Sequence, residues 1–343
     1  MTVSELPQRA ARRSVRRPLL LPLALPALAL AVSVGAADAQ TLAGRVVKAG
    51  RGVAGAPVEL HRVGAQQQGL VARGTSGADG RFSFALPQVD TAAGFNVFFA
   101  TALADGVRYF GPALHPGEQG AGYEIAVYDT TSARAALDSL RVARRDVILS
   151  PGVRGGWEVA EVVRVRNPGR RTVVGRDGMP AFGVAIPPRA SDFETGDSEQ
   201  LAQLGITQPR DLVLMGGRVL STIPIPPGDR DLFYRYRLPP GRSVELPLAQ
   251  ATDTVEVYVR QPSPKLRVSG LAAGPPLESE GETYQRWVGT ALRAGTAVTL
   301  RARRRGSPVD PRVAAVVVTT LLLTMGAFAA LRRRPVPGVG AGT

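Results

Sequence analysis

The chain has 343 residues and a formal net charge of +14, and it contains no cysteine. The lack of cysteine excludes disulfides, thiolate metal sites and lipoprotein anchoring. Most of the basic excess comes from arginines that flank two apolar segments, so the charge indicates membrane topology rather than a nucleic-acid-binding surface, and we expect no nucleic-acid partner.

Residues 1–39 have the pattern of a secretory signal peptide. Five arginines precede the apolar run LLLPLALPALALAV, and a small-x-small site, Ala37-Asp38-Ala39, follows it. We therefore expect cleavage between Ala39 and Gln40. Two prolines interrupt the apolar run, which disfavours an uncleaved anchor, and the pair Arg16-Arg17 leaves twin-arginine export open as an alternative route.

Residues 40–130 predict a β-sandwich. Short strand-like runs recur about every ten residues and are separated by Gly, Pro and Asp, which is typical of this fold. The predicted strands are residues 43–49, 56–63, 69–75, 81–86, 95–103, 107–111 and 123–129. Asp79-Gly80, ahead of the alternating Phe82 and Phe84, predicts a hairpin within residues 75–87. In the predicted strand 56–63 the apolar alternation fails near Val63, which predicts a bulge at the end of this strand.

Three motifs in this region carry a family resemblance: Gly44-Arg45-Val46, the run from Gly55 to Leu60, and the run from Thr75 to Phe84. In this order they resemble the carboxypeptidase regulatory-like family, which is related to collagen-adhesin B-type, transthyretin-like and starch-binding-like domains. The resemblance implies a prealbumin-like sandwich that serves as a scaffold. It implies the accessory domain of those carboxypeptidases and not the peptidase itself.

Residues 131–306 predict a second sandwich, for which an immunoglobulin-like fold is the best interpretation. Alternation places Leu232, Tyr234, Tyr236 and Leu238 on one face of a strand, and alternating valines mark residues 254–260 as another. Further strands are predicted at residues 157–167, 179–187 and 297–303, and a short helix at residues 198–205. The whole fold class is therefore all-β.

Candidate catalytic and metal sites are few. His115-Pro116-Gly117-Glu118 matches the H-x-x-E zinc motif, but no third histidine follows and Pro-Gly indicates a turn. The carboxylates Asp192, Glu194, Asp197 and Glu199 offer a weak calcium alternative, with solvated charges preferred. We expect no catalytic residues, no metal site and no cofactor.

Two further interpretations concern the predicted sandwiches. Lys48 and Asn96 fit the residue types of an intramolecular Lys–Asn cross-link, although solvated lysine is the preferred interpretation. Tyr109, Phe110 and Trp157 are candidates for stacking on a sugar, although aromatic residues at strand parity more often belong to a core.

Residues 313–331 form an uncharged apolar segment long enough to span a bilayer as a helix. Arg332 to Arg334 follow it and oppose translocation, so we expect residues 332–343 to form a cytoplasmic tail. Exchange of this tail for a surface anchor is a minority alternative, because no sortase pattern precedes it.

These features predict a non-enzymatic binding protein of the bacterial envelope. Its body is exported to the periplasm or cell exterior, and a single C-terminal span holds it in the cytoplasmic membrane. The expected partner is an unknown protein. The alternative is a carbohydrate-binding module that takes a glycan of the envelope.

Overall fold

The fold is given by a computed structural model that describes residues 40–64, 67–88, 96–118, 122–153, 155–196, 211–241 and 243–302. The predicted signal peptide, the predicted helix at 198–205, the apolar segment 313–331 and the tail lie outside these residues. Within the described ranges, no helix has the length and hydropathy that crossing a membrane requires. The prediction of an all-β chain is confirmed, since α1 (Arg134–Ser139) is the one α-helix among 23 strands in the described elements.

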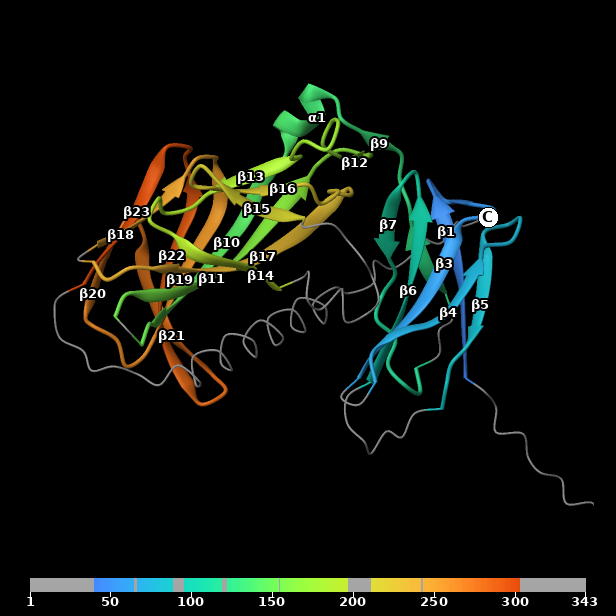
Figure 1. The fold of residues 1–343 in the computed structure, drawn as a ribbon, viewed down its shortest axis with the longest axis horizontal. Helices are drawn as coiled ribbons and strands as arrows, with labels where there is room; N and C mark the ends of the chain where they lie inside the picture. The colour runs from blue at the N-terminus through green and yellow to red at the C-terminus, as the bar shows by residue number, and fades with distance from the viewer. Residues whose placement is uncertain are drawn as a thin grey trace, which may run out of the picture. The chain divides into compact units, whose positions relative to one another are not determined.

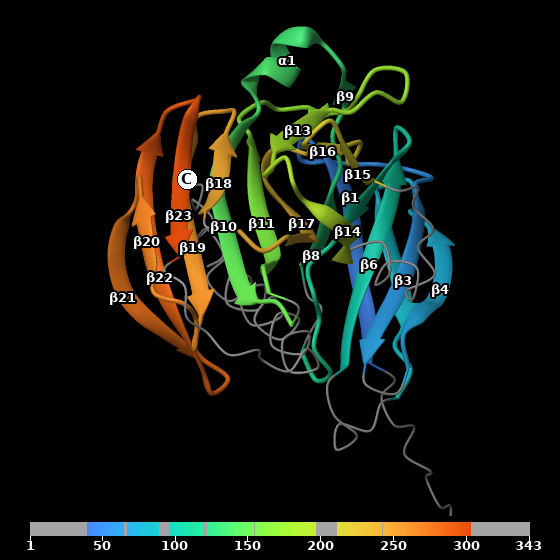
Figure 2. The same ribbon diagram turned by 60° about the vertical axis from the view of Figure 1, so that its left-hand side comes forward.

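The N-terminal region, residues 40–131, contains two four-stranded sheets (Figures 1 and 2). One has the order β2-β1-β5, with β8 parallel to β1, and comprises β1 (Thr41–Lys48), β2 (Arg51–Gly52), β5 (Arg81–Ala85) and β8 (Tyr123–Ala126). The other has the order β4-β3-β6-β7 and comprises β3 (Pro57–Gly64), β4 (Gly69–Thr75), β6 (Asn96–Ala104) and β7 (Val107–Phe110). Apolar side chains from both sheets form one core, as in a sandwich.

The turn at Asp79-Gly80 joins two sheets, so the prediction of a hairpin there is wrong. β4 pairs with β3, whereas β5 pairs with β1. Gly80 has a φ of 84°, and a Cβ at this position would lie 2.5 Å from the carbonyl oxygen of Val46. The sequence thus identified the backbone conformation of the turn, but local turn chemistry does not determine which strands pair.

The bulge predicted at the end of β3 is not found there, because the extra residue lies on the neighbouring β4. The pairing of β3 with β4 shifts its register between Leu60 and His61, where Leu60 lies opposite Ala72 and His61 opposite Leu70. The extra residue is therefore Val71 of β4, whereas β3 pairs with β6 from Val58 to Gly64 without a shift. The failed alternation marks an irregular pairing, but on the partner strand.

The C-terminal region, residues 132–302, is built on a seven-stranded sheet of order β14-β17-β11-β10-β19-β22-β21 (Figure 2). Its strands are β10 (Arg141–Pro151), β11 (Trp157–Asn167), β14 (Ser191–Thr195), β17 (Gly228–Leu238), β19 (Thr252–Arg260), β21 (Ala272–Ser279) and β22 (Glu282–Leu292). β10 and β19 run parallel, and the other neighbours in this sheet are antiparallel.

Two three-stranded sheets contribute to the same core as the large sheet. One has the order β13-β16-β15, with β13 (Phe182–Ala185), β15 (Leu212–Met215) and β16 (Arg218–Ser221). The other has the order β18-β23-β20, with β18 (Ser243–Leu248), β20 (Leu266–Ser269) and β23 (Thr296–Ala302). The remaining short strands β9 (Thr130–Thr131) and β12 (Thr172–Val173) pair in parallel.

The predicted faces of two strands in the large sheet are confirmed. Tyr234 and Tyr236 of β17 are buried in the core, as are Val255 and Val257 of β19. Alternation therefore identified which side of each strand the smaller sheets cover.

Candidate functional site

The aromatic residues proposed for sugar stacking do not form a platform. Tyr109 and Trp157 are only 5% and 6% exposed, and each belongs to a hydrophobic core, so their assignment as stacking residues is wrong. The Tyr109 hydroxyl donates to the Tyr128 carbonyl oxygen at 3.0 Å. Phe110 is half-buried and packs against Phe99, with 6.1 Å between ring centroids. Tyr109 and Trp157 are therefore core residues, whereas Phe110, the next residue along β7, lies on the opposite face of its strand.

The H-x-x-E motif forms a turn. The backbone N–H of His115 donates to Glu118 Oε2 at 2.8 Å, and the backbone N–H of Glu118 donates to the His115 carbonyl oxygen at 3.1 Å. The carboxylate therefore caps its own turn. Over the described ranges, no group of three histidine or acidic side chains is arranged to hold a metal ion.

The side chains considered for calcium binding and for the Lys–Asn cross-link make other contacts where the structure describes them. Asp192 and Glu194 lie on β14 and form ion pairs with Arg237 and Arg235 of the neighbouring β17, while Asp197 and Glu199 lie outside the described residues. Lys48 forms ion pairs with Asp105 and Asp129. Asn96 accepts hydrogen bonds from Arg62. The preferred interpretation of these charges was solvation, and the structure shows surface ion pairs instead.

A buried ionic cluster, missed in the sequence, occupies the core of the C-terminal region. It consists of Arg145 on β10, Glu161 on β11, and Tyr234 and Tyr236 on β17. Arg145 Nε and Nη2 donate to Glu161 Oε2 and Oε1 at 2.8 and 3.0 Å. The two tyrosine hydroxyls donate to the same carboxylate at 2.9 and 2.6 Å. Arg145 also donates to the carbonyl oxygens of Pro247 and Ala185.

The charged and polar groups of this cluster bind one another, as in a structural cluster rather than a ligand site. Burial and the negative charge of Glu161 raise the pKa of Tyr234 and Tyr236 well above the ordinary value. Burial alone would lower the pKa of Arg145, but the adjacent Glu161 raises it overall. Both carboxylate oxygens of Glu161 already accept hydrogen bonds. The cluster therefore holds a buried ion pair in the core and leaves no free carboxylate oxygen for a ligand. The sequence did contain a sign of this cluster. Glu161 shares its strand parity with Trp157, so alternation places an acidic residue on the core face of this strand.

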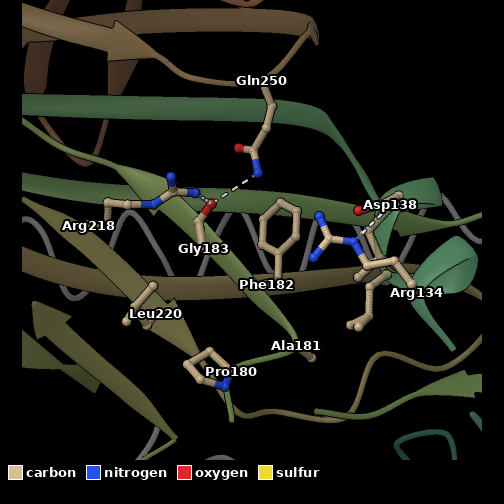
Figure 3. A pocket seen from close by; sticks show the side chains of 11 residues that line it. Arg134, Asp138, Pro180, Ala181, Phe182, Gly183, Arg218, Leu220 and Gln250 are labelled. Carbon is tan, nitrogen blue, oxygen red and sulfur yellow. Dashed lines mark hydrogen bonds and ion pairs between the residues drawn. The ribbon is translucent and has the colours of Figure 1, made fainter. Parts of the chain in front are cut away.

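A pocket of about 380 Å³ lies between α1 and the sheet that contains β13 and β16 (Figure 3). Its apolar lining comes from Leu137, Leu140, Pro180, Ala181, Phe182 and Leu220. Arg134, Asp138, Arg218 and Gln250 supply the polar groups, and Gly183 completes the wall. This volume falls in the lower part of the range usual for small-ligand sites.

Local turn chemistry positions the polar groups of the pocket. β15 and β16 are joined by Gly216 and Gly217, which both have positive φ, as a two-residue hairpin requires, so Arg218 begins the second strand. Arg134 and Asp138 are four residues apart on α1 and form an ion pair with 2.9 Å between Nε and Oδ2. The short helix is held by Ala136 and Leu137, which pack against the C-terminal core.

The Gly183 carbonyl oxygen is the point at which two polar side chains of the pocket meet. Arg218 Nη2 donates to it at 3.2 Å and Gln250 Nε2 at 3.0 Å, as Figure 3 shows. A Cβ at Gly183 would lie 2.9 Å from Leu220 Cδ2, so a larger residue there would crowd the wall. Figure 3 also shows the Phe182 ring with the Arg218 guanidinium on one side and the Arg134 guanidinium on the other.

Sequence reasoning did not find this pocket. Its residues come from four separate stretches between Arg134 and Gln250, and no short motif joins them. The strand that contains Phe182 was predicted, but α1 and the β15–β16 hairpin were not.

Comparison with known proteins identifies no family. No family model and no curated protein matches the chain. Solved structures that match include an M1 zinc metallopeptidase from Deinococcus radiodurans, with 16% identity, a TM-score of 0.28 and coverage of 50% of this chain and 44% of that chain. A putative protease from Parabacteroides distasonis matches with 10% identity, a TM-score of 0.27 and coverage of 48% and 40%. This chain spans less than half the length of those proteins, and a TM-score this low carries no functional argument.

Proposed function

We propose that this chain is a non-enzymatic binding protein, held outside the cytoplasmic membrane by one C-terminal span. Its body consists of a prealbumin-like sandwich of the carboxypeptidase regulatory-like type, residues 40–130, and an immunoglobulin-like sandwich, residues 131–306. Support for two units comes from the two largest hydrophobic clusters, one of which draws its buried residues from the N-terminal region and the other from the C-terminal region.

The observation that carries the proposal is the uncharged segment 313–331, followed by Arg332 to Arg334. A helix of this length satisfies its own backbone hydrogen bonds in a bilayer, and the arginines favour a cytoplasmic location for the tail. Together with the signal-like residues 1–39, this arrangement exports the body and leaves a short tail inside.

A binding role is supported by the way the described polar groups are used. Three of the carboxylates first considered as metal ligands, Asp192, Glu194 and Glu118, are paired with arginines or with a backbone N–H group. The pocket beside α1 instead combines hydrogen-bond donors with an apolar lining. We do not extend the proposal to glycans, because Tyr109 and Trp157, the aromatics on which that alternative mainly depended, are core residues.

Fractionation of cells that express the full chain tests this function. The full chain should stay in the membrane pellet after a high-salt wash, whereas a chain that ends at Pro311 should be released. A matched truncation that removes only residues 335–343 keeps the segment and its arginines, and it should stay in the pellet. External protease should digest the body of the full chain in spheroplasts. Release of the full chain by salt, or protection of its body, would contradict the proposal.

A further inference from the structure

We propose that the pocket beside α1 binds a carboxylate carried on a small apolar body, such as a hydrophobic amino-acid derivative or the C-terminal residue of a protein. This inference rests on the proposed binding role and names the chemistry of its ligand. Three features of the pocket carry it: its charge, its unused hydrogen-bond donors and its apolar lining.

The charge of the pocket matches a monoanion. Two arginines and one aspartate line it, which leaves one positive charge uncompensated. Arg218 has no carboxylate partner in the described part of the chain. Its Nη2 donates to the Gly183 carbonyl oxygen, which is neutral and leaves the charge of the guanidinium uncompensated. A cationic ligand would be repelled by this arrangement, and a dianion would exceed the available positive charge.

The donors have the geometry that carboxylates require. A guanidinium has five N–H groups in a planar fork, which pairs well with the two oxygens of a carboxylate. Arg134 uses its Nε toward Asp138, so its terminal nitrogens can face a ligand. The Arg134 side chain is 86% exposed and can turn toward the pocket without leaving a buried charge unpaired.

The lining provides a place for the apolar body. Leu140, Ala181 and Phe182 are only 6–7% exposed, and yet they line a pocket that is open to solvent. A ligand that covers the remaining surface of these residues would remove apolar area from water. The volume of about 380 Å³ limits that ligand to roughly one large side chain or a short acyl chain.

Titration calorimetry on the full chain in detergent tests the inference, with N-acetyl-L-leucine as the probe and N-acetyl-L-leucinamide as its uncharged match. The acid should bind at least about ten-fold more tightly than the amide, because a charge-assisted hydrogen bond is lost with the charge. Equal affinity for the two probes, or no binding of the acid, would overturn the proposal.

Three variants separate the pocket from general charge effects. Arg218→Gln should weaken binding of the acid about ten-fold, and Asp138→Asn should strengthen it, because the variant removes a carboxylate that competes for Arg134. Arg267→Gln, an exposed arginine on β20 outside the pocket, should leave affinity unchanged. A loss of affinity in Asp138→Asn, or equal losses in both arginine variants, would contradict the inference.

Peptides distinguish the two sources of such a carboxylate. A hexapeptide that ends in a free leucine should bind as tightly as the acid if the ligand is a protein C-terminus, and its amidated form should not bind. Binding of the acid alone would assign the pocket to a free small acid. Failure of all probes while the full chain remains salt-resistant in membranes would overturn this inference and leave the proposed anchoring intact.

Discussion

In the core of the N-terminal region, a polar side chain that reaches inward bonds the backbone, whereas in the core of the C-terminal region four polar side chains bond one another. The Tyr123 hydroxyl accepts from the Ala100 backbone N–H at 2.7 Å and donates to the Pro112 carbonyl oxygen at 2.8 Å. In the C-terminal region, Glu161 accepts all its hydrogen bonds from Arg145 and two tyrosines.

This difference teaches how each core is specified. The N-terminal core is filled by apolar side chains, and glycines allow its strands and turns to approach closely, as at Gly80. The C-terminal core contains an ion pair whose desolvation is offset only while every partner is present. The stability of the N-terminal core should therefore be most sensitive to changes in side-chain shape, and that of the C-terminal core to changes in charge.

The largest effect should come from Glu161→Gln. This change leaves the buried Arg145 without its counter-charge, and breaking such a pair costs about 3–5 kcal/mol in the free energy of unfolding. Glu158→Gln is the matched control, because Glu158 lies on the same strand, faces the other side and has only a 3.7 Å contact with Arg237. Urea denaturation should show a change below about 1 kcal/mol for the control. Similar losses in both variants would remove the contrast between the cores.

The second largest effect should come from Gly80→Ala in the N-terminal region. An alanine there combines a strained positive φ with close approach to Val46 and Gly52, at a total cost of about 3 kcal/mol. Gly106→Ala shares the positive φ, but its Cβ would meet nothing within 4 Å, so about 1 kcal/mol is expected. Thermal denaturation of the two variants compares them directly. An equal shift would show that conformation alone, and not close packing, sets the cost.

The third prediction concerns alkaline pH. Burial and the charge of Glu161 raise the pKa of Tyr234 and Tyr236, while unfolded tyrosines lose their protons near pH 10. The folded chain then holds more protons than the unfolded chain, so this stability is complete below pH 10 and falls as the pH rises further. Each of the two tyrosines contributes a slope of about 1.4 kcal/mol per pH unit.

The N-terminal core should respond less to alkaline pH. Burial raises the pKa of Tyr123 to about 12, so this tyrosine contributes between pH 10 and about pH 12. Urea midpoints measured from pH 9 to pH 11 should fall less steeply in the double variant Tyr234→Phe/Tyr236→Phe than in the original chain. An unchanged slope would show that the buried ionic cluster does not control this response.

The smallest effect distinguishes two buried hydroxyls. Tyr123→Phe removes the partner of the buried Ala100 N–H and should cost about 1 kcal/mol. Tyr284, on β22, is also buried, but its hydroxyl has no hydrogen-bond partner among the described residues. Tyr284→Phe should therefore change the free energy of unfolding by less than about 0.5 kcal/mol. The same denaturation assay compares them, and a larger loss in Tyr284→Phe would contradict the assignment.

Local patterns in the sequence predicted the strands better than their pairing. The faces of β17 and β19 followed from alternation, but the bulge predicted in β3 lies on its partner strand β4. The turn at Asp79-Gly80 was recognised, but its strands belong to different sheets because pairing depends on partners far along the chain.

The pocket and the buried ionic cluster were harder to predict for the same reason. Glu161 could have been noticed as an acid at a core position of its strand, but its partner Arg145 lies on another strand. The register places Arg145 opposite Val163, diagonal to Glu161, and the sequence does not reveal that register. The pocket requires α1, β13 and β16 to meet, and no local pattern encodes that meeting. Candidate residues chosen by type alone, such as Trp157, were instead those that fill the core.

The parallel pairing of β10 with β19 has a consequence for how the chain folds during synthesis. Val147 lies opposite Val257, so the centre of the large sheet joins segments far apart in sequence. β10 and β11 can pair as soon as both have been made, but the other edge of β10 stays unpaired until β19 has been made. Long-range pairing of this kind slows folding, and an unpaired strand edge can pair with other chains. The newly made C-terminal region should therefore be the part of this protein most dependent on chaperones.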